Sequence, residues 1–566
     1  MLSERCYMGV CFFPLDANAP KLFGFSEFLA GLALMVLAWT IGDVRYRFRV
    51  QTAPIPLRGF TFFVVATVGV LTLLTDLWRA EQWFVPAGNL LSPASWQALL
   101  AGFFLLTFLM WAWFAFIRPP IYSKRNAKQF ARSLYHFILK GSAEELAVIA
   151  DELSYSSRAL VHHATEKKSP YGPGDEKQRK VSDVESYAND LLMLIADKRF
   201  CRVIVESSPA TALGIFQEMQ DADKCVHVEI FSKNILNQAL SNKESFIFHE
   251  AGSYDSGLIG YHKPLTQAMF SNYKMVEVIG TLLDPDIMPQ QDWDASQWEG
   301  YSRIVLMTLS DYVSNHFWRH PFALYRAKGY IESAASDLYT LNGVLSSAWD
   351  KDVLARLRVT IEFISKAVEV LDTKGVSDDL IRRNRPENGI FEKTFYDHLA
   401  DMILEVICAA SNVTSPNWEC WVVQHNSVWS KFFNNHKLAT RVGKVIKFKV
   451  RRLLYNEVLE MNGFPNFRGA KILALCLNVM GLVPVKGDYS KSSRALHLAM
   501  LSWVRSNYGA LHSHNPRLAD ACLVGNMSYD QVNSRLVKTA PLEGLRTEPR
   551  YEYLDLVPVQ EGAPDK

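Results

Sequence analysis

The sequence shows no charge excess of either sign, no paired cysteine motif and no common nucleotide-binding pattern. Lysine and arginine number 60 against 58 for aspartate and glutamate, so the overall charge does not indicate a nucleic-acid partner. The patterns GxGxxG, GxxxxGK[ST] and GxSxG are absent, which removes the usual signals of a dinucleotide site, a P-loop and a hydrolase nucleophile. No CxxC pair is present, and the sequence predicts no metal site and identifies no cofactor.

Long apolar segments are present, and they gather near the beginning of the chain. A chain of 566 residues exceeds the roughly 250–300 residues of a single core, so several parts are expected. After an N-terminal tail at 1–21, residues 22–118 contain three apolar segments, at 22–41, 60–78 and 97–117. Each is close to the ~20 residues that a helix needs to cross a bilayer core, so we predict three transmembrane helices.

Basic residues predict the orientation of these helices. The first connection and the segment after the third helix carry the arginines and lysines Arg45, Arg47, Arg49, Arg58, Arg118, Lys124, Arg125, Lys128 and Arg132. Because such residues gather on the cytoplasmic side, we expect the N-terminus outside and the region after residue 118 inside. In a bacterial cell this describes a multi-pass protein of the inner membrane. A cleavable signal peptide is a weaker interpretation of 22–41, since the preceding segment is long and mixed in charge.

The cysteines divide between the two sides of the predicted membrane. Cys6 and Cys11 would lie outside, where they either form a disulfide or remain two free thiols. The other six would lie inside as reduced, buried thiols: Cys201, Cys225, Cys408, Cys420, Cys476 and Cys522.

The region that follows the membrane segments begins with a helix and a linker. Residues 119–164 form a basic, aromatic juxtamembrane segment that is predicted to be helical. Ser142 followed by Glu145 resembles a capping box within it. Residues 165–181 contain two prolines and two glycines and lose all apolar periodicity, so we interpret them as a linker.

Residues 182–297 predict an α/β domain. Short apolar segments at 201–205, 226–231 and 245–249 alternate with helical patterns, which is typical of a parallel sheet with crossover helices. The end of a helix is the alternative for 201–208.

A ligand crevice would then lie beyond the carboxyl ends of these strands. The strand ends and the glycine-rich segment FIFHEAGSYDSGLIGYHKP (246–264) supply candidates for binding a nucleotide-like ligand: Glu206, Ser207, Ser208, Ser232, Gly252, Gly257, Gly260 and Lys263. The candidate catalytic residues of a phosphate-directed hydrolase are His249, Glu250, Asp255 and His262. A loop without chemistry explains the same segment, because glycine permits sharp turns.

Residues 298–537 predict a large, mainly α-helical domain, and residues 538–566 an extended tail. Arg505 and His512 resemble the Arg-x(4–6)-His spacing of HEPN ribonucleases, which implies a pair that binds an RNA phosphate and moves a proton. This spacing is a loose pattern that many sequences match. A basic helix face formed by Lys437, Arg441, Lys444, Arg451 and Arg452 suits lipid head groups or RNA phosphates, or is simply a solvated face.

These features favour an inner-membrane protein whose cytoplasmic region senses a ligand or a protein partner and acts on a transmembrane bundle. By architectural analogy, membrane-acting effectors of anti-phage defence have this arrangement, and self-association of the bundle would perturb the bilayer. A membrane-tethered hydrolase or HEPN-like ribonuclease is the first alternative, and a passive membrane scaffold the second.

Overall fold

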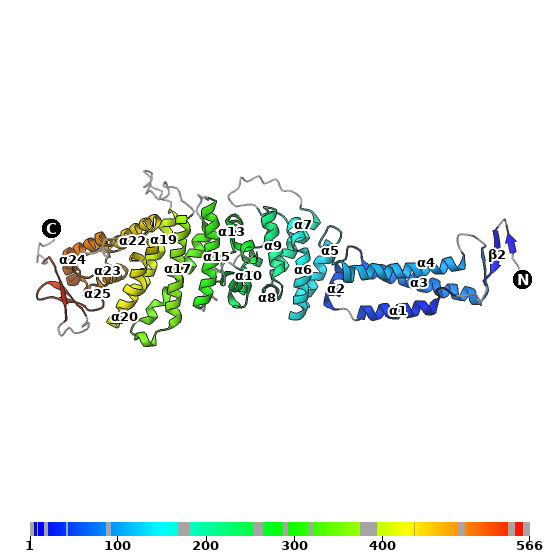
Figure 1. Ribbon diagram of the computed structural model, residues 1–566, viewed down its shortest axis with the longest axis horizontal. Helices are drawn as coiled ribbons and strands as arrows, with labels where there is room; N and C mark the ends of the chain where they lie inside the picture. The colour runs from blue at the N-terminus through cyan, green and yellow to red at the C-terminus, as the bar shows by residue number, and fades with distance from the viewer. Residues whose placement is uncertain are drawn as a thin grey trace. The chain divides into compact units, whose positions relative to one another are not determined.

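The computed structural model describes residues 5–7, 10–15, 21–40, 43–86, 92–167, 181–252, 264–286, 293–315, 321–373, 393–434, 436–484, 493–540 and 549–557 (Figure 1). The chain forms two compact units, Met1–Ala239 and Leu240–Lys566, which are described separately. Most described residues are helical, and two small antiparallel sheets complete the fold.

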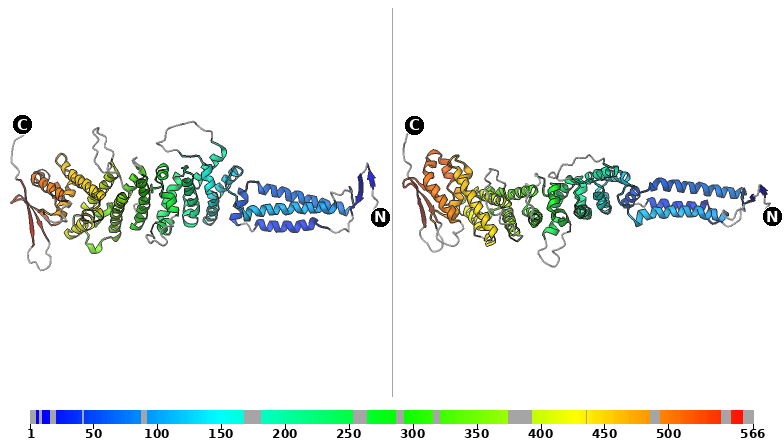
Figure 2. Two further views of the ribbon diagram at one scale, coloured as in Figure 1. Left: turned by 45° about the horizontal axis from the view of Figure 1, so that its top comes forward. Right: turned by 90° about the horizontal axis from the view of Figure 1, so that it is seen from above.

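Three apolar helices lie side by side in the first unit (Figure 1, Figure 2). They are α1 (Phe25–Thr40), α3 (Leu57–Ala80) and α4 (Pro93–Ala112), the last continued by the π-helical turn η1 (Trp113–Ile117). Helix α3, with 24 residues, and α4 with η1, with 25, are long and apolar enough to span a membrane. Helix α1 has 16 residues. The described chain therefore contains two candidate spans at the second and third predicted segments.

Phenylalanine rings set against glycines hold these helices together. A Cβ atom on Gly69 of α3 would lie 2.8 Å from the Phe28 ring of α1, and one on Gly31 would lie 2.8 Å from the Phe104 ring of α4. These rings belong to a small core that also contains Val68. The helices thus approach closely because the glycines have no side chain to displace.

A three-stranded antiparallel sheet joins the N-terminal segment to the connection between α3 and α4. Its strands are β1 (Arg5–Tyr7), β2 (Val10–Pro14) and β3 (Phe84–Pro86), in the order β1-β2-β3. Cys6 and Cys11 lie opposite one another in the backbone register. The predicted tail at 1–21 therefore contains two strands.

The remaining helices of the first unit begin with α2, in the connection between α1 and α3. They are α2 (Val44–Thr52), α5 (Ala127–Lys140), α6 (Ala143–His163), α7 (Asp183–Leu194), α8 (Lys198–Ser207), α9 (Pro209–Asp221) and α10 (Glu229–Ser241). The predicted capping box at Ser142 and Glu145 is confirmed at the start of α6.

The predicted parallel sheet is wrong for the described residues of 182–297. Residues 201–205 lie within α8, only Val226 of 226–231 forms a single isolated bridge, and 245–249 leads into α11 (Phe246–Gly252). In α8, the Asp197 carboxylate accepts hydrogen bonds from the next helical N–H groups, and burial follows the helical period. This local cap and the packing outweigh the strand preference of valine and isoleucine.

The second unit is built of helices, as predicted for most of 298–537. They are α11, α12 (Pro264–Phe270), α13 (Tyr273–Ile279), α15 (Ala295–Ser314), α16 (Phe322–Ser333), η2 (Ser336–Leu341), η3 (Ser346–Ala348), α17 (Lys351–Thr373), α19 (Phe395–Ser411), α20 (Asn417–Trp421), η4 (Val422–Trp429), α21 (Ser430–Phe433), η5 (His436–Leu438), α22 (Arg441–Glu460), α23 (Phe467–Met480), α24 (Arg494–His514) and α25 (Pro516–Ala521). Helix α19 packs against both α22 and α23.

A second three-stranded sheet follows these helices. Its antiparallel strands are β4 (Met527–Asp530), β5 (Arg535–Thr539) and β6 (Tyr551–Asp555). The Glu552 carboxylate accepts a hydrogen bond from the Leu482 N–H at 2.9 Å, which ties β6 to the end of α23. Strand β6 thus lies within the predicted extended tail at 538–566, whereas β4 and most of β5 lie within 298–537, which was predicted to be mainly helical.

Candidate functional site

The most constrained polar site lies where α2 meets α6 in the first unit. The guanidinium of Arg49 donates two hydrogen bonds to the Glu152 carboxylate, from Nε to Oε2 and from Nη2 to Oε1, both at 2.7 Å. The Arg49 side chain is 9% exposed and the Glu152 side chain 2%. The carboxylate hydrogen bonds raise the pKa of Arg49 above its ordinary value. We call the contact between α2, α6 and η1 the joint.

The same guanidinium reaches the end of α4. Its Nη1 donates to the backbone oxygen of Ala115 in η1 at 3.2 Å. In a regular helix this oxygen would accept the N–H of residue 119, but residues 119 and 120 are both prolines and have no N–H. Arg49 therefore supplies a donor that the backbone lacks, and a buried carbonyl without one would be costly.

Further contacts extend the joint. Arg45, one helical turn before Arg49, donates from Nη2 to the Asp151 carboxylate at 3.0 Å. The buried Phe48 ring packs edge-on against Phe130 of α5, with ring centroids 5.5 Å apart. Helix α2 is thus fixed by charge on one side and by aromatic packing on another.

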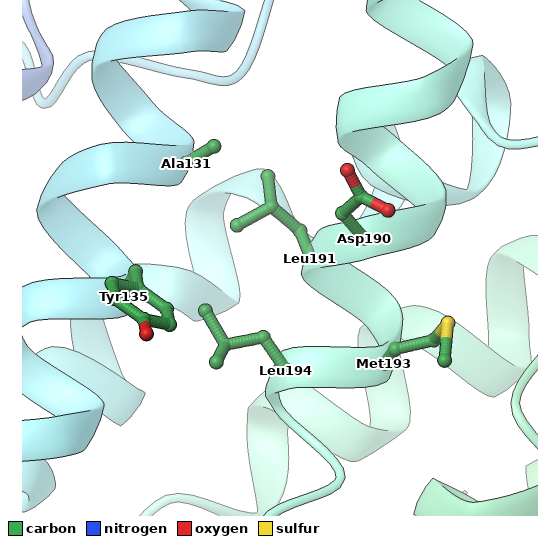
Figure 3. A pocket seen from close by; sticks show the side chains of 6 residues that line it. All are labelled: Ala131, Tyr135, Asp190, Leu191, Met193 and Leu194. Carbon is green, nitrogen blue, oxygen red and sulfur yellow. The ribbon is translucent and has the colours of Figure 1, made fainter.

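An open hollow lies between α5 and α7, with a volume of about 370 Å³ (Figure 3). It is lined by Ala131, Tyr135, Asp190, Leu191, Met193 and Leu194. From α7, Leu191 points toward Ala131 and Leu194 toward Tyr135, both on α5 (Figure 3). With one carboxylate and otherwise largely apolar lining, the hollow lacks the convergent polar groups of a typical catalytic pocket.

The residues predicted to bind a ligand lose the sheet that was expected to gather them. Glu206 and Ser207 end α8, and Ser208 links it to α9. Ser232 is buried in α10, where its hydroxyl donates to the Glu229 backbone oxygen at 3.0 Å. Gly252 is the last residue of α11. The candidates Gly257, Gly260, Lys263, Asp255 and His262 lie outside the described residues.

Of the two described catalytic candidates in the glycine-rich segment, Glu250 has a structural contact. Its carboxylate accepts hydrogen bonds from the Thr266 N–H at 2.7 Å and hydroxyl at 2.6 Å, so it caps the start of α12. His249 is largely exposed, with its Nε2 atom 3.6 Å from the Glu244 carboxylate. These contacts show how α11 holds α12 but form no nucleophile and base pair.

Arg505 and His512 both lie on α24, seven residues apart. A separation of seven places them on one face but about 10 Å apart along the axis. The His512 ring packs against Tyr529, with centroids 4.8 Å apart, and the Arg505 side chain is exposed. The two side chains thus share a helix face, and the structure shows no direct contact between them among the described residues.

The predicted two-faced helix is confirmed as α22 and the η5 turn before it. Lys437, Arg441, Lys444 and Arg452 are exposed, whereas Arg451 is half-buried, with its guanidinium 5.9 Å from the Phe448 ring centroid. Val442, Ile446 and other apolar residues are buried on the opposite face. The exposed basic side chains of this face are thus accessible to phosphate groups.

Comparison with known proteins supplies no further guide. No family model, curated protein or solved structure matches this chain. Across the described residues, no three His, Cys, Asp or Glu side chains are grouped in a way that could hold a metal ion. The joint, which the sequence counted only as positive charge near the membrane, is therefore the feature from which function is best inferred.

Proposed function

We propose that this chain is a membrane protein in which α1, α3 and α4 cross the bilayer and the joint transmits movement of the following helical region to them. The observation that carries the proposal is the buried Arg49–Glu152 pair, because Arg49 also contacts the end of α4. In this proposal, the helical region senses a ligand or a protein partner on the cytoplasmic side of a bacterial inner membrane.

The exposed surface of α3 and α4 supports insertion. Only 28% of the α3 window and 22% of the α4 window are buried within the protein. Large apolar side chains such as Phe62, Phe63 and Leu106 are exposed. A core helix of a water-soluble protein would bury such residues, whereas lipid tails solvate them without cost.

Contacts at one end of the bundle support a crossing by α1 as well. Strand β2, before α1, pairs with β3, after α3, and the Phe25 N–H donates to the Asp76 carboxylate at 2.9 Å. The start of α1 thus lies beside the end of α3, and the chain must traverse the bundle before it enters α3 at Leu57. Sixteen residues span about 24 Å, so local thinning of the bilayer or the apolar residues just before Phe25 would complete the crossing.

The joint suits transmission because α2 lies in the connection between α1 and α3 and contacts the start of α3. A shift of α6 would move Glu152, Arg49 and the Ala115 carbonyl together, and so the adjoining ends of all three helices. Removing one partner of a buried ion pair typically costs about 3–5 kcal/mol, so the contact resists slippage. Such a protein fits a membrane-acting effector, including one of anti-phage defence, that opens or deforms the bilayer when copies associate.

Membrane potential in intact cells tests the proposal. The full chain is expressed with a fused inducible dimeriser that brings copies of the helical region together. We expect this to abolish the membrane potential, which a potential-sensitive dye reports. Glu152→Gln should reach the membrane in equal amount but reduce the membrane potential less, because the joint is weakened. The exposed Glu144→Gln on the same helix is the matched control and should act like the unaltered chain.

An intact potential at full expression of the unaltered chain would overturn the proposal. An equal loss of membrane potential with Glu152→Gln would show that the joint takes no part in the proposed transmission. The hydrolase alternative has less support, because Glu250 caps a helix, and the ribonuclease alternative rests only on the Arg505–His512 spacing, with the His512 ring packed against Tyr529.

A further inference from the structure

Six exposed basic side chains surround the same end of the bundle as the joint. They are Arg47, Arg58, Arg118, Lys124, Arg125 and Lys128, and we call them the basic rim. Within the described part of the chain, none of them forms a salt bridge or a side-chain hydrogen bond. Arg45 and Arg49, from the same stretch of sequence, are by contrast paired with acids of α6.

The rim residues lie on segments that pack around α2. Helix α2 contacts α3, η1 and α5, and the Asn126 side-chain amide donates to the Thr52 backbone oxygen at 2.8 Å. This hydrogen bond fixes the turn that carries Lys124 and Arg125. The segments that carry the six charges are therefore held around α2 by the fold, although the charges are spread over about 80 residues of sequence.

Among the described residues, the acids of the joint do not neutralise the rim. The sequence has no aspartate or glutamate from 117 to 143. Asp151 and Glu152 already bind Arg45 and Arg49. The Asp43 side chain accepts from the Arg45 backbone N–H at the start of α2. Exposed cations that form no ion pair within the described part of the chain attract an external anion.

Apolar side chains mark where this polyanion would lie. Ile117, the last residue of η1, is 65% exposed, and Ile55 and Ile121 are exposed beside other rim residues. The apolar surface of the spans therefore gives way directly to the basic rim. In a bilayer this transition coincides with the phosphate layer, where arginine and lysine are favoured.

We propose that the basic rim binds the phosphate groups of anionic phospholipids, and that this binding holds α2 and α5 in place around the joint. The ligand chemistry is a phosphodiester anion, and its source is the lipid head group of the leaflet next to α2. The inference rests on the proposed insertion of the bundle into a membrane. Lipid composition would then tune how firmly the joint connects to the spans.

Lipid binding to the purified full chain tests the inference. We expect fluorescent phosphatidylglycerol in mixed micelles to bind more tightly than phosphatidylcholine and to be released by salt. The combined change Arg118→Gln, Lys124→Gln, Arg125→Gln and Lys128→Gln should weaken phosphatidylglycerol binding by roughly tenfold or more. The control removes the same charge from exposed residues of the second unit, by Lys351→Gln, Arg358→Gln, Lys431→Gln and Arg517→Gln, and should bind normally.

Three outcomes would overturn the inference. Equal binding of the two lipids would show that the protein does not select an anionic head group. Unchanged binding by the rim variant would show that the basic rim is not the binding site. Displacement of the lipid by inorganic phosphate at the same concentration would show that a free anion suffices. Alkaline extraction of membranes separates the two proposals. Release of the chain would refute the proposed membrane spans, whereas a retained chain without lipid preference would refute only the lipid binding by the basic rim.

Discussion

Replacing Glu152 by leucine probes the joint at its most buried charge. The change leaves the Arg49 guanidinium, itself 9% exposed, without its two 2.7 Å acceptors. Loss of one partner from a buried pair costs about 3–5 kcal/mol. Because Arg49 keeps the Ala115 carbonyl, we expect the lower end, about 3 kcal/mol, as a loss in the free energy of opening α2.

A double-mutant cycle separates the pair from its surroundings. Arg49→Leu leaves the Ala115 oxygen without a donor, which adds about 1–3 kcal/mol, whereas Glu152 keeps the Arg45 Nε atom at 3.3 Å. In the combined variant both charges of the pair are gone, and the carbonyl penalty and the lost contact of Arg45 with Glu152 remain. The combined loss should therefore fall short of the sum of the single losses by about 3 kcal/mol or more.

Hydrogen exchange of the amides at 44–52, followed by mass spectrometry in nanodiscs, measures these losses. A change of 3 kcal/mol corresponds to exchange more than about 100-fold faster. The adjacent Asp151→Asn is the control, because its half-exposed pair with Arg45 contributes at most about 1 kcal/mol. Additive single losses, or unchanged exchange in Glu152→Leu, would refute the account of the joint.

Three other features give further tests. Gly69→Leu should disrupt the bundle and lower its thermal stability, whereas Gly102→Leu, where a Cβ atom meets nothing within 4 Å, should be tolerated; equal losses would contradict the packing described. Burial lowers the pKa of His497, so as pH falls the unfolded chain binds the proton before the folded chain does. The contribution of neutral His497 to the free energy of unfolding is therefore complete above about pH 6.5 and is lost as pH falls through the lowered pKa. Thermal unfolding from about pH 7 to 5 should show this loss, and His497→Gln should reduce it; a flat profile for the unaltered chain would contradict it. Cys6 and Cys11 face one another in the backbone register, so with an external N-terminus we expect a maleimide to label them in intact cells only after reduction, and labelling without reduction would contradict this.

Features encoded within one segment could be predicted from the sequence. The apolar segments at 60–78 and 97–117 fall within α3 and α4–η1, since twenty apolar residues in a row have few alternatives to a helix. The capping box at Ser142 and the two faces of α22 depend on residues three and four apart. Each of these patterns contains both partners of the interaction that stabilises it.

Features that need a distant partner could not be predicted. The segment at 201–205 resembles a strand in isolation, and burial against neighbouring helices determines its conformation. Arg49 and Glu152 are 103 residues apart, and nothing in either segment identifies the other. The same holds for β6, whose pairing with β5 crosses residues 541–548 outside the described part.

The arginines of α2 show how a helix divides one sequence signal between two roles. Residues 45, 47 and 49 alternate with other residues, a spacing that would place all three on one side of a strand. In a helix, positions 45 and 49 are about 40° apart, whereas 47 lies about 200° from 45. Arg45 and Arg49 therefore meet the acids of α6, and Arg47 is exposed within the basic rim. It follows that Arg47→Gln should weaken binding of anionic lipid, whereas Arg49→Gln should leave the rim charges in place and speed exchange in α2; equal losses of lipid binding in the two variants would show that the two roles are not separate.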